Sequence, residues 1–509
     1  MGSGGSTRTL IIAGSALALD IDFSNNIVKK VALSFPDSGE IVTRHAEKAG
    51  NILLRDLEFK QNESPLTKML DRFAANLERL ATLDNLSLIP GLNCYEAISG
   101  IFESLQRLHE WEVERLKEQE DTQWHGEEAV DIMAMCMKSG KPVMHTRDRL
   151  GLSLDYWREK RRLRTKVKKC EEPKTWSLLV ECAPMPHMGY PPVRASERWI
   201  SPDIQKENPP AAELFLAAEG GPVLDWVEPD NTLLPNAEAH KVDAMEGIDQ
   251  PSNQKFPEVI FVAKFDPPLV VPYGLAMQIH NLTNAPLEYQ THTYDGLMFP
   301  YGPEDKIDVG EGRTITNTTT VPIFGKDGEI SSRIHKNELI IEKIDYGYRC
   351  TELPFSHPRQ LVEALPILRQ YAFLSTLLSK AFSHKPAADS TPETKKLEKQ
   401  SKTDEFKTFT SQSSTHPSTP FPVDIALTIG PLPRLQVIFP FKNRTANIMF
   451  DIKLNGIVEV VSQNMIVEVV DVDRDGPGGE GMKASDLGTM LEITEDLGIW
   501  VEFLRRRFG

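Results

Sequence analysis

Apolar residues recur at helical spacing in the stretch FSHPRQLVEALPILRQYAFLSTLLSKAF, residues 355–382. Pro358 lies two residues after Ser356, and a helix tolerates proline in its first turn because the missing N–H would have no partner there. Pro366 lacks the N–H that an interior residue donates, so we expect it to interrupt the helix. The pattern therefore predicts a short turn and then a helix over Ile367–Phe382, with one apolar face made of Ile367, Leu368, Tyr371, Leu374, Leu378 and Phe382.

The N-terminal part combines a strand pattern with helical patterns. Leu10–Phe23 and Ile27–Ser34 are apolar runs joined by a short polar turn, which predicts a β-hairpin. Ser64-Pro65 is typical of a helix start, and the apolar stripe behind it consists of Leu66, Met69, Leu70, Phe73, Leu77 and Leu80. Asn93, with Glu96 three residues later, predicts a capping box at the start of a second amphipathic helix.

From Gly151 onward the pattern favours strands. The predicted strands are short, rich in aromatic or β-branched residues and separated by proline-containing connections. Pro272–Leu282 indicates one short helix among them. Before the helix that ends at Phe382, the predicted strands are Gly151–Trp157, Trp176–Ala183, Arg198–Ser201, Val259–Phe265, Ile307–Val321, Glu329–Ile334 and Leu339–Ile344.

After Phe382 the composition changes twice. His384–Pro420 is poor in apolar residues and rich in Ser, Thr, Lys and Pro, so it is expected to be disordered. Apolar alternation then returns and predicts strands near Val423–Ile429, Leu435–Phe439, Ala446–Leu454 and Ile457–Glu468, followed by a closing helix that ends at Arg505–Arg507.

These elements predict an α+β fold of antiparallel sheet layers with flanking helices, interrupted by a disordered insert. The predicted division is a linker over residues 1–9, a hairpin with helices over 10–150, a β-rich region with its final helix over 151–382, a disordered linker over 383–420 and strands with a closing helix over 421–509.

Composition and charge restrict the class of protein. The chain has 509 residues, of which 40% are hydrophobic and 26% charged, as in globular proteins. Its net charge of −16 argues against broad binding to DNA, because such affinity comes from neutralising phosphates. The five cysteines are scattered and form no CxxC pair, which suits a reducing compartment. We find no apolar run approaching the ~20 residues that span a bilayer, so a soluble intracellular protein is expected.

Candidate motifs for metal or catalytic chemistry are weak. Asp471-x-Asp473-x-Asp475-Gly476 begins like a calcium loop, but Met482 occupies the position of the bidentate glutamate. The histidines are spread singly, and His357, beside the start of the predicted helix, is expected to cap or pack rather than bind metal. The sequence contains no GxSxG nucleophile elbow and no phosphate-binding glycine loop. We therefore predict no enzyme, no cofactor and no metal.

One run is strongly basic, and it supplies the candidate interaction residues. It could contact nucleic acid or phosphoinositide phosphates, act as a nuclear-import signal or meet an acidic partner. It could equally be a charged edge strand that blocks unwanted pairing. The candidate residues are Arg158, Arg161, Arg162, Arg164, Lys166, Lys168 and Lys169.

The segment Leu374–Leu378 reads LSTLL and matches LxxLL, a helical docking motif. The same leucines lie on the apolar face of the predicted helix, so we expect them in the core.

The series of elements resembles a known family. FSHPRQLVEALPILRQYAFLSTLLSKAF is similar to the signature helix of the family of Mediator complex subunit 1, and FVAKFDPPLVVPYGLAMQI (Phe261–Ile279) is similar to its strand, turn and helix. The resemblance extends to the N-terminal hairpin and helix, the strands over Val423–Val460 and the closing helix, and it is to a fungal member. A helical segment expected before the hairpin and the long LxxLL-bearing tail of animal members have no counterpart.

This resemblance implies a non-enzymatic transcription coactivator in the nucleus. It implies a scaffold of the Mediator middle module, in contact with subunits 4 and 9 and indirectly with RNA polymerase II and activators. It implies neither membrane attachment nor direct DNA binding.

Overall fold

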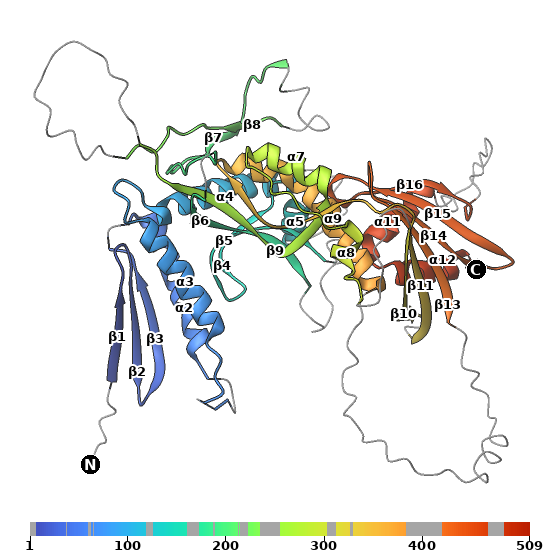
Figure 1. Cartoon of the computed structure of the whole chain (residues 1–509), viewed down its shortest axis with the longest axis horizontal. Coiled ribbons are helices and arrows are strands. Elements are labelled where there is room, and N and C mark those ends of the chain that lie inside the picture. The colour runs from blue at the N-terminus through green and yellow to red at the C-terminus, as the bar shows by residue number, and fades with distance from the viewer. Residues whose placement is uncertain are drawn as a thin grey trace, which may run out of the picture. The chain divides into compact units, whose positions relative to one another are not determined.

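The chain folds into two compact units (Figure 1). The first comprises Met1–Thr291 and Gly347–Arg369, and the second His292–Tyr346 and Gln370–Gly509. The computed structural model describes residues 7–36, 38–59, 63–64, 66–118, 126–159, 173–186, 189–211, 213, 222–234, 255–302, 312–325, 329–382, 420–466 and 483–508. Most of the predicted linker over residues 1–9 lies outside these residues, and so does almost all of the predicted disordered insert. The predicted division into five segments stays a prediction.

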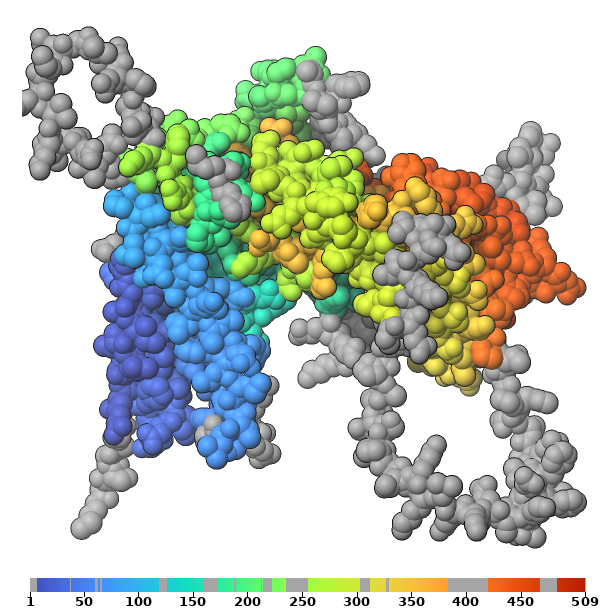
Figure 2. All heavy atoms as spheres, in the orientation of Figure 1, coloured from blue at the N-terminus to red at the C-terminus, as the bar shows by residue number. Residues whose placement is uncertain are grey.

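The first unit begins with a three-stranded antiparallel sheet (Figure 1), whose residues form the dark blue part of Figure 2. Its strands are β1 (Thr7–Ala13), β2 (Ala18–Ser24) and β3 (Ile27–Ser34). The prediction of one strand over Leu10–Phe23 was wrong, because the chain turns at Gly14. The turn is held by the Asp84 carboxylate, which accepts the N–H groups of Ser15 and Ala16 at 2.8 and 2.7 Å.

Helices follow this sheet along the chain, and α2 packs against β3. They are α1 (Glu40–Thr43), α2 (Ala46–Leu57), α3 (Asp71–Leu86), α4 (Cys94–Glu118) and α5 (Glu127–Met137). The predicted start of α3 near Ser64 was wrong: Thr67 N–H donates to the Ser64 carbonyl in a turn, and Leu66 is 96% exposed. At α4, Asn93 accepts the N–H groups of Tyr95 and Glu96, as predicted for a cap, but the Glu96 carboxylate accepts from Gly39 instead of completing the box.

A five-stranded antiparallel sheet forms the centre of the first unit. Its order is β12-β9-β6-β5-β4. The strands are β4 (Lys141–Thr146), β5 (Arg149–Arg158), β6 (Thr175–Pro184), β9 (Val259–Pro272) and β12 (Gly347–Phe355), and α7 (Tyr273–Thr283) follows β9 where a short helix was predicted. A small separate pair consists of β7 (Ile200–Gln205) and β8 (Leu224–Trp226).

The second unit contains a six-stranded sheet of order β10-β11-β13-β14-β15-β16. Neighbouring strands are antiparallel except β11 and β13, which run parallel. The elements are α8 (Tyr294–Met298), β10 (Arg313–Phe324), β11 (Ile330–Ile341), β13 (Phe421–Thr428), β14 (Arg434–Phe441), β15 (Arg444–Ile452), the 3₁₀ turn η2 (Leu454–Gly456), β16 (Val458–Gln463), α11 (Ala484–Thr494) and α12 (Leu497–Phe508).

Two sequence predictions in this unit were wrong. The pair Glu329–Ile334 and Leu339–Ile344 is one strand, β11, because the polar residues between them pair continuously with β10. The single closing helix is two helices, because Glu495 adopts a left-handed conformation (φ 48°) and ends α11. The α+β class itself is confirmed.

Helix α9 (Pro358–Phe382) runs unbroken through Pro366, so the predicted interruption was wrong. A proline removes one backbone hydrogen bond, and burial on both sides of it keeps the helix intact. Leu361, Ala364, Leu365 and Leu368 are fully buried. By length and composition alone α9 could cross a bilayer, but 72% of its most apolar 18-residue window is buried inside the protein.

Candidate functional site

The basic run lies at the connection between β5 and β6. Arg158 is the last residue of β5, an interior strand, and its guanidinium lies 3.9 Å from the Glu128 carboxylate. The next residue, Glu159, donates its N–H to the Lys174 carbonyl at 2.9 Å. The remaining candidates, Arg161, Arg162, Arg164, Lys166, Lys168 and Lys169, lie outside the described residues.

The LxxLL match is part of the core. Leu374, Leu377 and Leu378 each have 0% of their surface exposed. A docking motif must present these leucines to a groove on a partner. The prediction that they pack inside is confirmed.

Metal and catalytic candidates found no support among the residues that the structure describes. No group of three or more His, Cys, Asp or Glu side chains there could hold a metal. The calcium-like loop from Asp471 to Met482 lies outside them. His357 caps α9, as expected, by accepting the Arg359 N–H at 3.0 Å while its other ring nitrogen meets the Val227 carbonyl at 2.9 Å.

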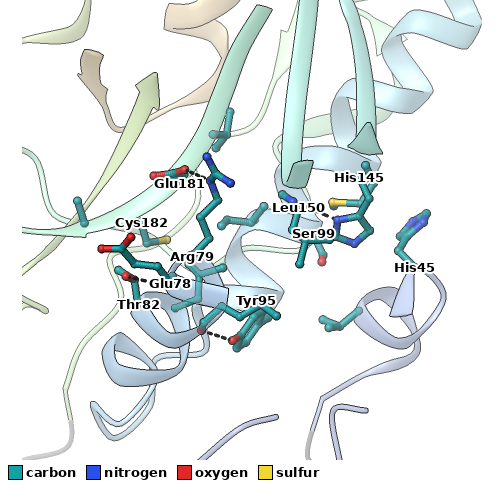
Figure 3. A pocket seen from close by; sticks show the side chains of 18 of the residues that line it. His45, Glu78, Arg79, Thr82, Tyr95, Ser99, His145, Leu150, Glu181 and Cys182 are labelled. Atoms are coloured by element: carbon teal, nitrogen blue, oxygen red, sulfur yellow. Dashed lines mark hydrogen bonds and ion pairs between the residues drawn. The ribbon is translucent and has the colours of Figure 1, made fainter. Parts of the chain in front are cut away.

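The first unit contains a cavity of about 400 Å³ (Figure 3). Its wall is built from β3, α3, α4 and strands of the central sheet, and it is mainly apolar. The apolar lining residues are Leu33, Phe35, Val42, Leu80, Leu83, Tyr95, Ile98, Met144, Leu150 and Val180. Volume and lining are those of pockets that hold a small apolar molecule or an apolar side chain.

Charged groups at one side of the cavity pair with one another. The Glu181 carboxylate lies 3.1 Å from Arg79 Nε (Figure 3) and 2.7 Å from Lys264 Nζ. Arg79 also donates to the Asn76 side-chain oxygen at 3.1 Å. These ion pairs connect α3 to β6 and β9, so the charged groups bind one another within the protein.

Histidines at the opposite side are kept neutral (Figure 3). Burial lowers the pKa of His145 to about 3, with His45 and Lys48 acting in the same direction. Its Nδ1 accepts the Gly151 N–H at 3.1 Å, so the ring is already hydrogen-bonded. Burial also lowers the pKa of His45. Neither ring is charged at neutral pH.

The Cys182 thiol lies in the cavity wall. Contact with Cys94 and burial raise the pKa of Cys182, so it stays protonated. Burial likewise raises the pKa of Tyr95, whose hydroxyl donates to the Leu80 carbonyl at 2.8 Å. These residues suit binding of an apolar group, and they supply no activated nucleophile or base.

Sequence reasoning missed this cavity. Arg79 and Glu181, which meet at its side, are separated by 102 positions in the chain. Each lining residue belongs to an ordinary amphipathic element, so no local pattern distinguishes it.

The sequence of this chain is similar to one family of known proteins. Residues 1–383 match the family model described as Mediator of RNA polymerase II transcription subunit 1. The chain is also similar to Mediator of RNA polymerase II transcription subunit 1 of Schizosaccharomyces pombe, at 28% identity over 153 residues. That alignment spans 29% of this chain and 29% of the yeast protein. The family model covers about three quarters of the chain, and the protein therefore belongs to the Mediator subunit 1 family.

Proposed function

We propose that this protein is a non-enzymatic coactivator subunit of the Mediator complex that works in the nucleus. It acts as a scaffold of the middle module, and it links activators to RNA polymerase II through its neighbours, subunits 4 and 9. The single observation that carries the proposal is the family match over residues 1–383.

The described side chains support a scaffold role. The buried charged side chains of Arg369 and Glu502 form hydrogen bonds with other parts of the chain. A scaffold needs a stable shape and surfaces for neighbours, and it needs no activated groups.

Co-purification tests this function. A tagged full-length chain expressed in fungal cells should bring down middle-module subunits, including 4 and 9, from nuclear extract. A matched tagged chain with Trp500→Asp, which places a charge at a fully buried position of the second unit, serves as a folding-defective control. A folded wild-type chain that recovers no Mediator subunit would contradict the proposal.

The basic run carries a second candidate function, as a nucleic-acid or phosphoinositide contact. Its cations are concentrated within Arg158–Lys169 of an otherwise acidic chain. Replacing Arg161, Arg162 and Arg164 with alanine should then abolish a salt-sensitive interaction with duplex DNA or with vesicles that contain phosphoinositides. Absence of binding by the wild-type chain at low salt would remove this candidate.

A further inference from the structure

The outer strand of the N-terminal sheet, β1, has an open edge. The strand order is β1-β2-β3, so β1 pairs on one side alone within the described part of the chain (Figure 1). Its seven residues pair with β2 without a register shift, and six of the seven are exposed. An edge strand of this kind is a template for another strand.

The hairpin register shows which backbone groups face outward. Gly14 N–H donates to the Leu17 carbonyl at 2.8 Å, so these two residues form a hydrogen-bonded pair at the turn. Hydrogen-bonded and non-hydrogen-bonded pairs alternate along an antiparallel ladder. The backbone N–H and C=O groups of Arg8, Leu10 and Ile12 therefore point to β2. Those that point to the open edge belong to Thr7, Thr9, Ile11 and Ala13.

The side chains of β1 continue an apolar surface that the helices leave uncovered. Leu10 lies opposite Ile21, which is 3% exposed, yet Leu10 itself is 50% exposed. The core of the sheet therefore ends at β1, where Ile12 still packs against it but Leu10 does not. On the other face Ile11 is 64% exposed and lies opposite Asp20.

The other edge of the same sheet is protected. On β3 Lys29 and Lys30 are exposed, and lysines on an edge strand oppose pairing with other strands. Helix α2 also lies so close to β3 that a Cβ on Gly50 would be 2.6 Å from the Val31 carbonyl oxygen. β1 has neither protection: it carries no proline, no lysine and no bulge, and its single charge is Arg8.

We propose that β1 accepts an extended segment of Mediator subunit 4 or 9 as a fourth strand of this sheet, an inference that rests on the proposed function. The outward backbone groups select an extended strand rather than a helix, as in known cases of strand addition. Leu10 and Ile11 select aliphatic residues in that strand. Asp20 and Asp22 lie on the same face as Ile11 but one strand further in, so a long basic side chain of the added strand is the kind that reaches them across β1.

A proline at position 11 should block pairing at the open edge of β1 without affecting the folding of the chain. Ile11→Pro removes a donor that points outward and leaves every hydrogen bond between β1 and β2 in place, a position where edge strands tolerate proline. Ile11→Thr is the matched control, because it keeps the N–H and suits a strand. Unchanged melting temperatures of both full-length variants would show that the fold is retained.

The experiment uses the full-length chain reconstituted with recombinant subunits 4 and 9. We expect hydrogen exchange at the Thr9, Ile11 and Ala13 amides to be fast in the free chain and slowed in the complex. Ile11→Pro should weaken assembly by about tenfold or more, the scale of one or two lost backbone hydrogen bonds, and Ile11→Thr by much less.

The outcomes separate the two proposals. A complex that forms without protecting β1, or that forms equally well with Ile11→Pro, overturns strand addition and leaves the Mediator assignment intact. Protection of β1 that depends on the concentration of this chain alone would show pairing between two copies and would also overturn it. Failure of the folded wild-type chain to bind either subunit would overturn both proposals.

Discussion

At the residue scale, buried charge in this protein organises the backbone. Arg369 is 1% exposed, and its guanidinium donates to the carbonyls of Tyr156 and Met135 at 3.0 and 2.9 Å and to that of Lys138. These carbonyls belong to β5 and to the end of α5, which α9 thereby holds together. A buried cation is tolerated because such hydrogen bonds replace its hydration.

Acid should weaken the first unit through His145, whose folded pKa is about 3. Its ordinary value is about 6.5, so between these two pH values the unfolded chain takes up a proton that the folded chain does not. Above about pH 6.5, His145 therefore gives the free energy of unfolding no pH dependence. Below that pH, it lowers the free energy of unfolding by up to roughly 1.4 kcal/mol per pH unit.

The variant His145→Asn tests this effect. Asparagine keeps a hydrogen-bond acceptor for Gly151 and tolerates the left-handed backbone (φ 53°) at this position. Melting temperatures measured from pH 7.5 to 4.5 should fall less steeply for this variant than for the wild type. The exposed His292→Asn is the control, and equal slopes for all three chains would show that His145 does not set the acid sensitivity.

At the scale of elements, α9 shows how much local pattern reveals. The spacing of its apolar residues correctly predicted a buried helix, and α7, β5 and β6 were predicted near their observed positions. The interruption at Pro366 and the helix start near Ser64 were wrong, because packing against the rest of the fold overrides local preference. The apolar stripe predicted for α3 includes Leu66 and Met69, but these residues lie before the observed helix and are 96% and 75% exposed.

The leucines of the LxxLL match should affect stability before they affect binding. Leu378→Ala removes a fully buried side chain and is expected to cost about 2–5 kcal/mol of unfolding free energy. Urea unfolding followed by tryptophan fluorescence measures this. Ser375→Ala, a partly exposed position on the same helix, should change stability by less than about 0.5 kcal/mol. A Leu378→Ala chain of normal stability that loses a partner would restore the docking hypothesis.

At the scale of the whole molecule, the second unit depends on residues from both sides of the insert. β11 pairs in parallel with β13, and the buried Glu502 of α12 lies 3.0 Å from Arg333 and 2.8 Å from His335, both on β11. Phe450 and Trp500 add an edge-on aromatic contact with ring centroids 5.9 Å apart. The part of the chain beyond the family match therefore completes the sheet that the matched part begins.

A split chain should consequently reassemble. We expect residues 1–382 alone to aggregate, because they expose the edge of β11 that β13 pairs with in the full chain. Co-expression with residues 420–509 should yield a soluble complex that survives gel filtration. Leu435→Asp in the second fragment, at a fully buried position, should abolish reassembly. A soluble, cooperatively melting 1–382 fragment would contradict this account.

The sequence by itself determined the α+β class, the buried face of α9 and the absence of recognisable catalytic motifs, because periodicity and motif spacing are local properties. The tertiary structure alone decided the parallel pairing of β11 with β13, the carbonyls that Arg369 binds, the cavity beside Arg79 and Glu181, and the open edge of β1. Each of these depends on which distant segments become neighbours, and the free energy of such pairing is spread over many ordinary apolar residues that carry no local signature.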